Sequence, residues 1–585
     1  MMPRNLFAHV MLAFVSAFAA IFFLSGCDRL KPSVPTANTV PSPSAASELR
    51  WSNGRRLKTI DPVLAAAPPE TDLVRALFDG LTEIDSRTQR AVPAIAEKWE
   101  SSHDWRTWRF YLRENAVWTN GRPVTANDFV RSWNRYAEIA ERAAFPELLL
   151  NLGKAGISPL QRQDEGQISN RGPEKEKNTA ALTKAESASA KGSAANTVTT
   201  SGKREKLNVL AESDRVLRVE LSYPDRDFPV LAAHPAFRPV YETNLEFEPT
   251  EQAVGKLVTN GAFCIERLTE TGVSLVPFEH YWDRDSVKLD RVQMIFSEPE
   301  KALNAYRSGE LDAVSNLDLS PAAVKIFEPY DDFRRVTHAA VNLYEINTSK
   351  APFTDRRVRM ALATAIERER LVDGEMQGTV RPAFDVLPFR SRVELQISQD
   401  VAVAKSLLSE AGFSDGVGFP AIILVVNRND LQLRIARAVA RMWKQNLGID
   451  TEIAVRDGPE IDGIRRSGDY DLVRRGVVFA APDETAALIT LFSDRLQKHE
   501  SKQTEPVRPI TDATERTRNM LGRRAAVESP TPTEFTELIY EMRFIPLYFP
   551  TAVSLVKPYV KGMEPNAFDI VILKNVEINK SLQQK

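Results

Sequence analysis

Cysteine and histidine are scarce in this chain of 585 residues. There are two cysteines, Cys27 and Cys264, and six histidines. Neither cysteine belongs to a Cys-x-x-Cys pair, and the histidines do not gather around them, so the spacing typical of a zinc site is absent. We therefore expect no metal site and no bound cofactor.

The chain also lacks an excess of charge of either sign. Its 76 basic and 78 acidic residues give a net charge of −2, which favours neither nucleic acid nor an anionic membrane surface as a partner. The motif His-Glu-x-x-His and the phosphate-binding loop are missing as well, and the Gly-x-Ser-x-Gly string at 412–416 does not form a nucleophile elbow, because no strand-like run precedes it. We therefore predict no catalytic residues and no enzymatic activity.

One long hydrophobic run stands at the N-terminus. Arg4 precedes an almost wholly apolar stretch at 7–24, which ends in Leu24-Ser25-Gly26-Cys27. This order is typical of a secretory signal, and the last four residues resemble the lipobox of bacterial lipoproteins, whose cysteine becomes a thioether to diacylglycerol. We expect a signal at 1–27, a lipid on Cys27 and a chain outside the cytoplasm. The alternative is an uncleaved helical anchor, since a span needs ~20 residues.

Two other stretches are poor in large apolar side chains. Residues 28–47 are rich in Pro, Ser, Ala and Thr, which is typical of a flexible tether. Residues from about 158 to 206 contain Glu-Lys and Ala-Ser runs and would bury little, so we expect a disordered surface insertion there. The remaining sequence is long enough for two or three hydrophobic cores.

Between these stretches the pattern predicts a mixed α/β protein. Trp108, Phe110 and Leu112 alternate with polar residues, as in a half-buried strand. Thr125 and Asp128 then form a capping-box pattern at the start of an amphipathic helix.

A second region predicts a parallel or mixed sheet. Residues 422–427 are a short apolar run of strand length, 431–447 have helical spacing ended by Gly448, and 451–455 again suit a strand. Strand, helix and strand at this length form a crossover unit. Upstream, Asp355 is placed to cap another helix.

Tryptophan, asparagine and glycine residues in the first half have structural interpretations. We expect Trp99, Trp108, Trp118 and Trp133 to lie in the core. The pair Asn260 and Gly261 is expected to shape the backbone where the chain passes between domains.

Several segments, in order along the chain, together resemble one family. The most specific block is WRFYLRENAVWTNG at 108–121, followed by PVTANDF at 123–129. The ordered set, from about 48 to 576, is similar to the bacterial extracellular solute-binding proteins of family 5, which include oligopeptide, dipeptide and nickel binders. The other matching segments are 57–62, 77–81, 93–100, 258–263, 281–283, 306–312, 347–348, 352–359, 442–448, 467–471, 545–548 and 556–558.

The resemblance implies an α/β fold of the periplasmic-binding-protein type II kind, with two lobes, a hinge and an extra domain. In this family domains I and III close on the solute, and the loaded protein docks on a membrane permease pair driven by cytoplasmic ATPases. We expect a monomer that captures oligopeptides for an ABC importer. Domain I would comprise 48–86, 207–338 and 549–585, domain II 87–206, and domain III 339–548.

The resemblance also shows a departure in the expected ligand site. Oligopeptide binders carry an Arg-x-Gly-Trp stretch and then an aspartate that binds the peptide ammonium. The corresponding residues 474–480 read RRGVVFA, so that Ala480 stands in place of the aspartate. Asp483 could replace it only if the loop is rebuilt. Ala65-Ala66-Ala67 likewise stands where an oligopeptide binder has an acidic contact.

Two arginines, Arg465 and Arg474, fall where relatives place arginines in the ligand cleft. The functional interpretation is bidentate recognition of a carboxylate. The alternative is an ion pair at the surface or between domains, which is the commoner role of an arginine.

Two functions therefore remain open. The first is capture of peptides for import. The second is a divergent relative that acts as a sensor or docking protein with a lost or altered ligand site. The missing aspartate and the polar stretch at 498–532 favour the second. A nickel or haem ligand would also fit the wider family, but the scattered histidines do not support it.

Overall fold

The computed structural model describes residues 47–153, 206–241, 249–317, 319–389, 397–500 and 538–583. Cys27, the signal at 1–27, the tether apart from its last residue, the insertion up to 205 and most of the polar stretch lie outside the described residues, so these expectations stay predictions. Within the described ranges, no helix has the length and apolar character to cross a membrane, and no His, Cys, Asp and Glu residues form a group that could hold a metal ion. Cys264 is a free, half-buried thiol.

Residues 46–585 make one compact unit, whose longest sheet has seven strands in the order β12-β19-β11-β1-β10-β9-β8. β1 runs parallel to β10 and β11, whereas the other neighbours are antiparallel. The strands are β1 (Glu48–Ser52), β8 (Phe263–Thr269), β9 (Gly272–Pro277), β10 (Arg291–Ile295), β11 (Ala313–Val314), β12 (Phe333–Thr337) and β19 (Thr551–Val556), and the helices α2 (Glu70–Leu77), α7 (Pro299–Arg307) and α8 (Pro321–Phe327) belong to the same part.

A second, antiparallel sheet has the order β4-β5-β7-β6 and carries α3 (Ala126–Glu138) against it. The strand expected around Trp108 is confirmed as β5, with alternate side chains buried. The capping box of Thr125 and Asp128 is confirmed at the start of α3. The strands are β4 (Ala96–Ser101), β5 (Thr107–Leu112), β6 (Val209–Ser213) and β7 (Val216–Glu220).

One hydrophobic cluster joins these two sheets, and we call this part of the molecule the first lobe. Trp108, Trp118 and Trp133 are buried in it, as expected, whereas Trp99 is half-buried at its edge. Its short elements are β2 (Thr82–Ile84), β3 (Ala91–Pro93), β20 (Val560–Lys561), β21 (Glu577–Ile578), α5 (Phe228–Leu231), α6 (Glu251–Val254), α17 (Lys580–Gln583), η1 (Ala140–Arg142), η2 (Pro146–Asn151), η3 (Pro235–Phe237), η4 (Arg284–Ser286) and η6 (Leu573–Asn575).

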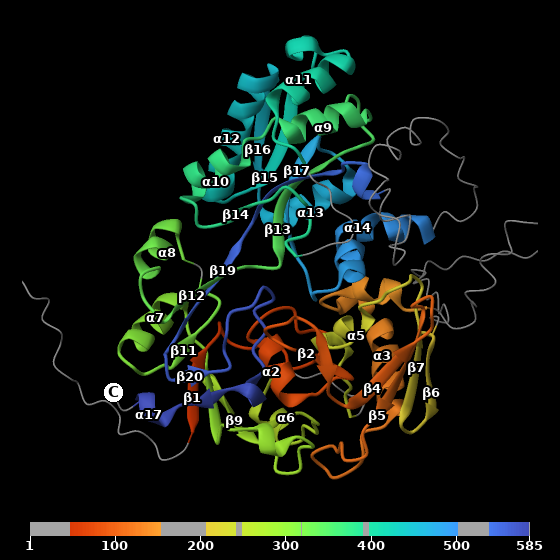
Figure 1. Cartoon of the computed structure of the whole chain (residues 1–585), viewed down its shortest axis with the longest axis vertical. Coiled ribbons are helices and arrows are strands. Elements are labelled where there is room, and N and C mark those ends of the chain that lie inside the picture. The colour runs from red at the N-terminus through yellow and green to blue at the C-terminus, as the bar shows by residue number, and fades with distance from the viewer. Residues whose placement is uncertain are drawn as a thin grey trace, which may run out of the picture. The chain divides into compact units, whose positions relative to one another are not determined.

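The second lobe is built on a six-stranded sheet in the order β14-β18-β13-β17-β15-β16, seen at the top of Figure 1. The crossover unit is confirmed, because β15 and β16 run parallel and α12 joins them. Gly448 ends α12 with φ of 74°, and Asp355 caps α9 by accepting from Arg357 N. The elements are β13 (Ala340–Ile346), β14 (Arg381–Pro382), β15 (Ile422–Asn427), β16 (Thr451–Arg456), β17 (Leu472–Val478), β18 (Phe544–Phe549), α9 (Arg356–Thr364), α10 (Arg368–Met376), α11 (Val401–Glu410), α12 (Asp430–Leu447), α13 (Gly458–Ser467), α14 (Glu484–Glu500) and η5 (Ser414–Gly416).

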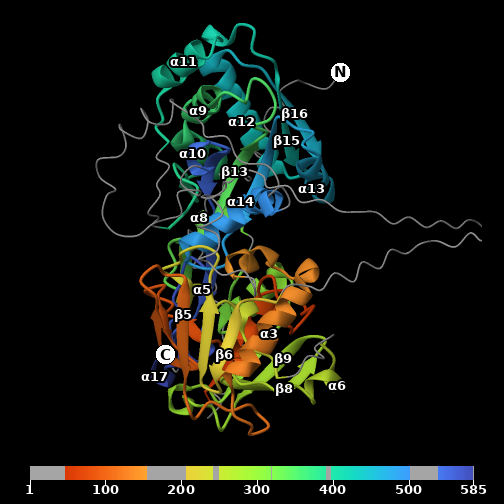
Figure 2. The ribbon, with the colours of Figure 1, turned by 90° about the vertical axis from the view of Figure 1, so that its right-hand side faces the viewer.

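The chain passes between the sheets of the two lobes at two places that lie side by side, one between β12 and β13 and one between β18 and β19. His338 N donates to Pro550 O at 2.8 Å, which joins the two crossings, and Ala339 N donates to Ala567 O at 2.6 Å. Figure 2 shows the two lobes from a second direction, with α14 at the level where they meet. Two short backbone segments thus connect the lobes.

Candidate functional site

A group of polar side chains lies on one face of the six-stranded sheet, next to α12. β13 is flanked by β17 and β18, with Tyr344 opposite Arg474 and Asn342 opposite both Gly476 and Tyr548. A Cβ at Gly476 would lie 3.0 Å from Arg474 Nη2. The missing side chain at 476 therefore leaves room for the Arg474 guanidinium.

Arg474 is enclosed without a carboxylate partner among the described residues. Its Nη2 donates to Asn342 Oδ1, while its Nε is buried and has no acceptor. Burial lowers the pKa of Arg474, and the neighbouring Tyr548 and Tyr344 act in the opposite direction. Arg474 is half-buried, and a desolvated guanidinium nitrogen usually has an anionic or polar partner, so this arrangement is suited to an anion from outside the chain.

Two tyrosines add hydrogen-bond donors beside Arg474. Tyr344 is buried and its hydroxyl has no partner, while the Tyr548 hydroxyl accepts from Gln432 Nε2 at 3.0 Å and keeps its own proton to donate. Burial raises the pKa of both phenols, so both remain neutral donors. Within the described part of the chain, Arg474 Nε and the Tyr344 hydroxyl lack a partner, and the Tyr548 hydroxyl adds a proton to donate, which suits a carboxylate.

Arg465 takes part in a different group, around Glu345. Glu345 accepts from Arg543 Nη2 at 2.5 Å and from Arg465 Nε at 3.3 Å, and Arg475 Nη1 lies 3.6 Å away. Burial alone would raise the pKa of Glu345, but Arg475, Arg543 and Arg465 together lower it. Arg465 is thus engaged in an ion pair, and a role for it in ligand binding stays a prediction.

Ala480 and Asp483 follow β17 and face the first lobe. Ala480 is half-buried and packs against the core of that lobe. Asp483 is fully buried, and its Oδ1 accepts from Ala486 N at 2.8 Å, which caps α14. Its carboxyl is therefore engaged in the structure, and the suggestion that it replaces the missing aspartate stays a prediction.

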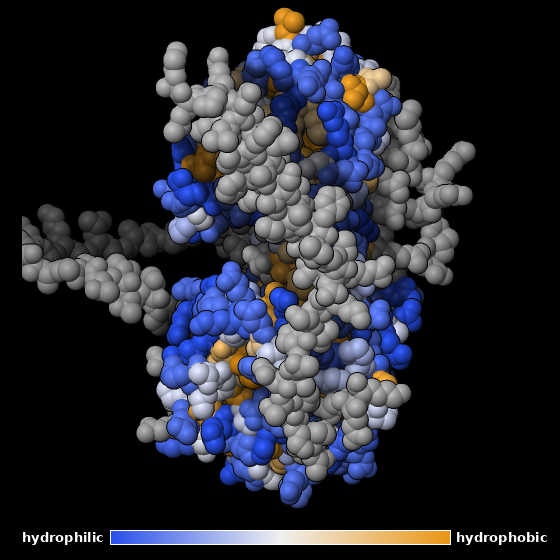
Figure 3. Space-filling view, turned by 90° about the vertical axis from the view of Figure 1, so that its left-hand side faces the viewer, coloured by the Kyte–Doolittle hydropathy of each residue, from blue (hydrophilic) through white to orange (hydrophobic). Residues whose placement is uncertain are grey.

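The surroundings of Ala480 are aromatic. The Phe389 ring lies 5.9 Å from that of Phe479 and 5.8 Å from that of Phe568, which belongs to the first lobe. Phe479 N donates to Ala339 O at the crossing between the lobes. Figure 3 shows hydrophobic surface in the recess between the lobes, among largely hydrophilic residues. Apolar contacts thus dominate around Ala480, where the resemblance predicts a carboxylate in oligopeptide binders.

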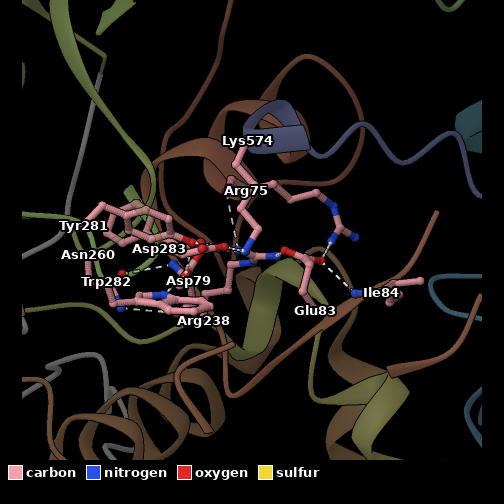
Figure 4. Close-up of polar contacts among 11 residues, drawn as sticks. Arg75, Asp79, Glu83, Ile84, Arg238, Asn260, Tyr281, Trp282, Asp283 and Lys574 are labelled. Carbon is pink, nitrogen blue, oxygen red and sulfur yellow. Dashed lines mark hydrogen bonds and ion pairs between the residues drawn. The ribbon is translucent and has the colours of Figure 1, made fainter. Parts of the chain in front are cut away.

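A second cluster of charges lies buried in the first lobe, and Figure 4 shows its members turned toward one another. Glu83 accepts from Arg75 at 3.0 Å and also from Arg238. Burial would raise the pKa of Glu83, but Arg238 and Arg75 lower it, and burial lowers the pKa of Arg75 to about 10. The charges are paired within the chain, so we interpret this cluster as structural.

The same cluster continues through Asp79, which ties three segments together. Its carboxylate accepts from the Tyr281 hydroxyl at 2.7 Å and from Trp282 Nε1 at 2.8 Å, and its backbone N–H donates to Asn260 Oδ1 at 3.1 Å. Beside Asn260, a Cβ at Gly261 would lie 2.5 Å from Ala76 O. Asn260 and Gly261 therefore fix the backbone, but they do so against α2 within the first lobe and not where the chain passes between the two lobes.

Sequence reasoning did not find Tyr344, Tyr548 and Gln432 as parts of the site. They lie on three elements far apart in the chain, and only the sheet and α12 bring them beside Arg474. A tyrosine in a strand is ordinarily a core residue, so neither tyrosine had a signal of its own.

The comparisons with known proteins agree with this fold. The model of the bacterial extracellular solute-binding proteins, family 5 (middle part), matches residues 90–498. The periplasmic oligopeptide-binding protein OppA of Salmonella typhimurium is 28% identical over 574 residues, which cover 94% of this chain and 96% of that protein. The periplasmic murein peptide-binding protein MppA of Escherichia coli is 29% identical over 521 residues, covering 87% and 88%.

A solved structure shows the same architecture. That of the murein tripeptide binding protein MppA of Escherichia coli superimposes with a TM-score of 0.60 and 26% identity, covering 92% of this chain and 99% of that one. The likeness confirms the type II periplasmic-binding-protein fold expected from the sequence. The family binds solutes and its relatives here are periplasmic. This chain belongs to the bacterial extracellular solute-binding proteins of family 5.

Proposed function

We propose that this chain captures peptides between its two lobes and delivers them to the membrane permease of an ABC importer. Its relatives are named for binding oligopeptides and murein peptides. The observation that carries the proposal for this chain is the enclosed Arg474, which has amide and phenol neighbours and an unpartnered Nε. The carboxylate of a peptide is the anion that this group would bind.

The proposal assigns roles to the side chains around Arg474 and to the two lobes. Arg474 would bind the carboxylate with Tyr344 and Tyr548. The aromatic wall of Phe389, Phe479 and Phe568 would cover apolar parts of the ligand. The first lobe would correspond to domains I and II and the second to domain III, closing about the crossings at His338 and Pro550.

Anchoring and partners complete the proposal. Cys27 would carry the lipid and hold the chain on the periplasmic side of a bacterial membrane. A monomer would then present the loaded lobes to a permease pair with cytoplasmic ATPases. The lipobox-like Leu24-Ser25-Gly26-Cys27 supports this part.

Calorimetry tests the site with a mixture of tri- to pentapeptides, followed by one bound peptide and its C-terminal amide. Loss of the carboxylate should weaken binding about tenfold or more, because a charge-assisted hydrogen bond contributes about 1.5–3 kcal/mol. Arg474→Lys should weaken binding of the peptide with a free carboxylate and remove its advantage over the peptide amide, since lysine cannot bind a carboxylate in bidentate fashion. Arg466→Lys, at an exposed position of α13, is the matched control.

The competing function is that of a divergent sensor or docking protein. Ala480, packed against apolar neighbours instead of offering a carboxylate, favours it. Absence of binding to every peptide, with no peptide leaving the native protein in mass spectrometry, would support this function and reject peptide import. Equal binding of acid and amide would instead reject the role of Arg474 alone.

A further inference from the structure

The N-terminus of α14 is a contact between the two lobes. Ala481 and Ala486, which follow β17 of the second lobe, pack into the hydrophobic core of the first lobe. η2 of the first lobe packs against α14, and Glu147 there lies close enough to Thr490 of α14 for Thr490 to act on its pKa. Figure 1 shows α14 reaching from the second lobe toward the first.

Two aspartates, one from each lobe, meet at this contact. Asp225 lies between β7 and α5 and is 2% exposed, and Asp483 is 0% exposed. Their carboxyl groups lie close enough that each shifts the pKa of the other. Two ionised carboxylates in this buried position would repel each other strongly, so one of the two is expected to carry a proton.

The hydrogen-bond partners of Asp225 and Asp483 do not remove the need for a proton on one of the two carboxyl groups. Asp225 accepts from Asn151 Nδ2 at 3.2 Å and from Asp227 N at 3.0 Å. Asp483 Oδ1 accepts from Ala486 N, while its Oδ2 is enclosed without an amide or hydroxyl donor. Neutral donors thus hold both residues in place without supplying a positive charge.

Among the described residues, the charged groups that shift the pKa values of the pair are acidic. Burial, then Asp483 and Asp227, raise the pKa of Asp225 well above its ordinary value. Burial raises the pKa of Asp483 to about 6, with smaller contributions from Asp227 and Glu484 in the same direction, against the lowering effect of the Ala486 amide and Asp225. From η2, burial likewise raises the pKa of Glu147, which Arg475 and Thr490 act to lower.

We propose that Asp225 and Asp483 form a proton-dependent link between the lobes, which holds α14 against the first lobe while the pair retains its protons and loosens when it loses them. The direction of the pH dependence follows from the linkage between proton binding and the strength of the contact. A pKa raised in the joined state makes the contact strongest at low pH and weakens it as pH rises through that value. An aspartate that is freed into water returns to its ordinary pKa of about 3.9.

The expected size of the change in opening follows from the pKa values in the contact and in water. For Asp483 alone, moving from about 6 to about 3.9 raises the opening constant of the contact about tenfold between pH 5 and pH 8. Asp225 adds to this in the same direction. Because α14 follows directly after β17 and Ala480, the link connects proton concentration to the element beside the proposed ligand site.

Hydrogen exchange with mass spectrometry tests the link on the ligand-free full chain, in the segment 484–490 between pH 5 and pH 8. After correction for intrinsic exchange, protection of this segment should fall about tenfold or more from pH 5 to pH 8. Asp225→Asn should remove the share of this dependence that Asp225 contributes, and Asp225→Asn combined with Asp483→Asn should give a flat profile, since neither carboxyl group then remains to lose a proton. Asp483→Asn should remove at least the tenfold part of the dependence, because it removes the group whose pKa is about 6, while the asparagine still caps α14.

Asp331→Asn, at an exposed position of the first lobe, is the control and should keep the wild-type slope. A flat wild-type profile would overturn the proposal. A pH dependence of protection equal to that of the wild type in both Asp225→Asn and Asp483→Asn would also overturn it. Either variant that folds can be measured in this way. Since no ligand is present, the result is independent of the peptide-binding proposal.

Discussion

At the scale of single residues, buried charges in this protein differ in whether the chain supplies their partners. Arg75 and Arg238 share Glu83 within the first lobe, so their charges are balanced internally. Among the described residues, Arg474 donates to an amide and lies beside two phenols. The first arrangement stabilises a fold, and the second is suited to an incoming carboxylate.

Glu83→Gln is expected to destabilise the protein strongly. Arg75 and Arg238, with side chains 6% and 0% exposed, would lose the carboxylate that they share. Breaking a buried ion pair from one side costs about 3–5 kcal/mol in the free energy of unfolding, which urea titration measures. Glu328→Gln removes the partner of Lys325 and Arg335, and with a side chain 40% exposed it should cost ~1 kcal/mol or less. Equal losses in the two proteins would contradict this prediction.

At the scale of elements, the distance to the neighbouring backbone decides whether a glycine can be replaced by a larger residue. Gly261 follows Asn260, and its N–H donates to Leu77 O at 2.8 Å at the end of α2. α10 contains Gly374 in open surroundings, where a Cβ would meet no atom within 4 Å. The same substitution should therefore have opposite effects at these two glycines.

Gly261→Ala is expected to destabilise the first lobe. The new Cβ would lie 2.5 Å from Ala76 O and from Leu77 C, which are backbone atoms and cannot rotate away. Overpacking of this kind costs about 1–3 kcal/mol. Gly374→Ala should instead stabilise by about 0.5–1 kcal/mol, because alanine is the better helix former. Thermal unfolding of the two proteins checks both signs, and a neutral Gly261→Ala would refute the packing argument.

At the scale of the whole molecule, two lobes are joined by two backbone crossings and by the contact at α14. The crossings are short, so movement of the lobes requires only a few residues to change conformation. The contact at α14 adds side chains from both lobes, among them Asp225 and Asp483. Its strength therefore bears on how readily the lobes separate.

Anchoring of the whole molecule is predicted to depend on Cys27. Cys27→Ala removes the thiol that would carry diacylglycerol, so the protein should leave the membrane fraction or accumulate with its signal uncleaved. Cell fractionation with mass measurement of the N-terminus checks this. Cys264→Ala should leave anchoring unchanged, since that thiol is half-buried in the folded body. An unaltered membrane fraction with a processed chain in Cys27→Ala would exclude the lipid anchor.

Much of the fold was predictable because its signals are local. The alternation at 108–112, the capping box of Thr125 and Asp128, and the crossover unit ended by Gly448 each depend on neighbouring residues. The site was predictable only in part. The resemblance pointed to Arg474, whose part in binding stays a prediction, but not to Tyr344 and Tyr548, because their place beside Arg474 depends on strand neighbours distant in sequence.

The sequence by itself determined the family and the α/β class, since each is a matter of residue type and order, and it placed Ala480 where the resemblance predicts a carboxylate. Only the tertiary structure decided the partners of the charged groups. Arg465 lies against Glu345, Arg474 lies among phenols, and Asp483 meets Asp225 across the lobes. The physical reason is that burial and pairing, which set the pKa and the function of a charged group, arise from packing between distant segments.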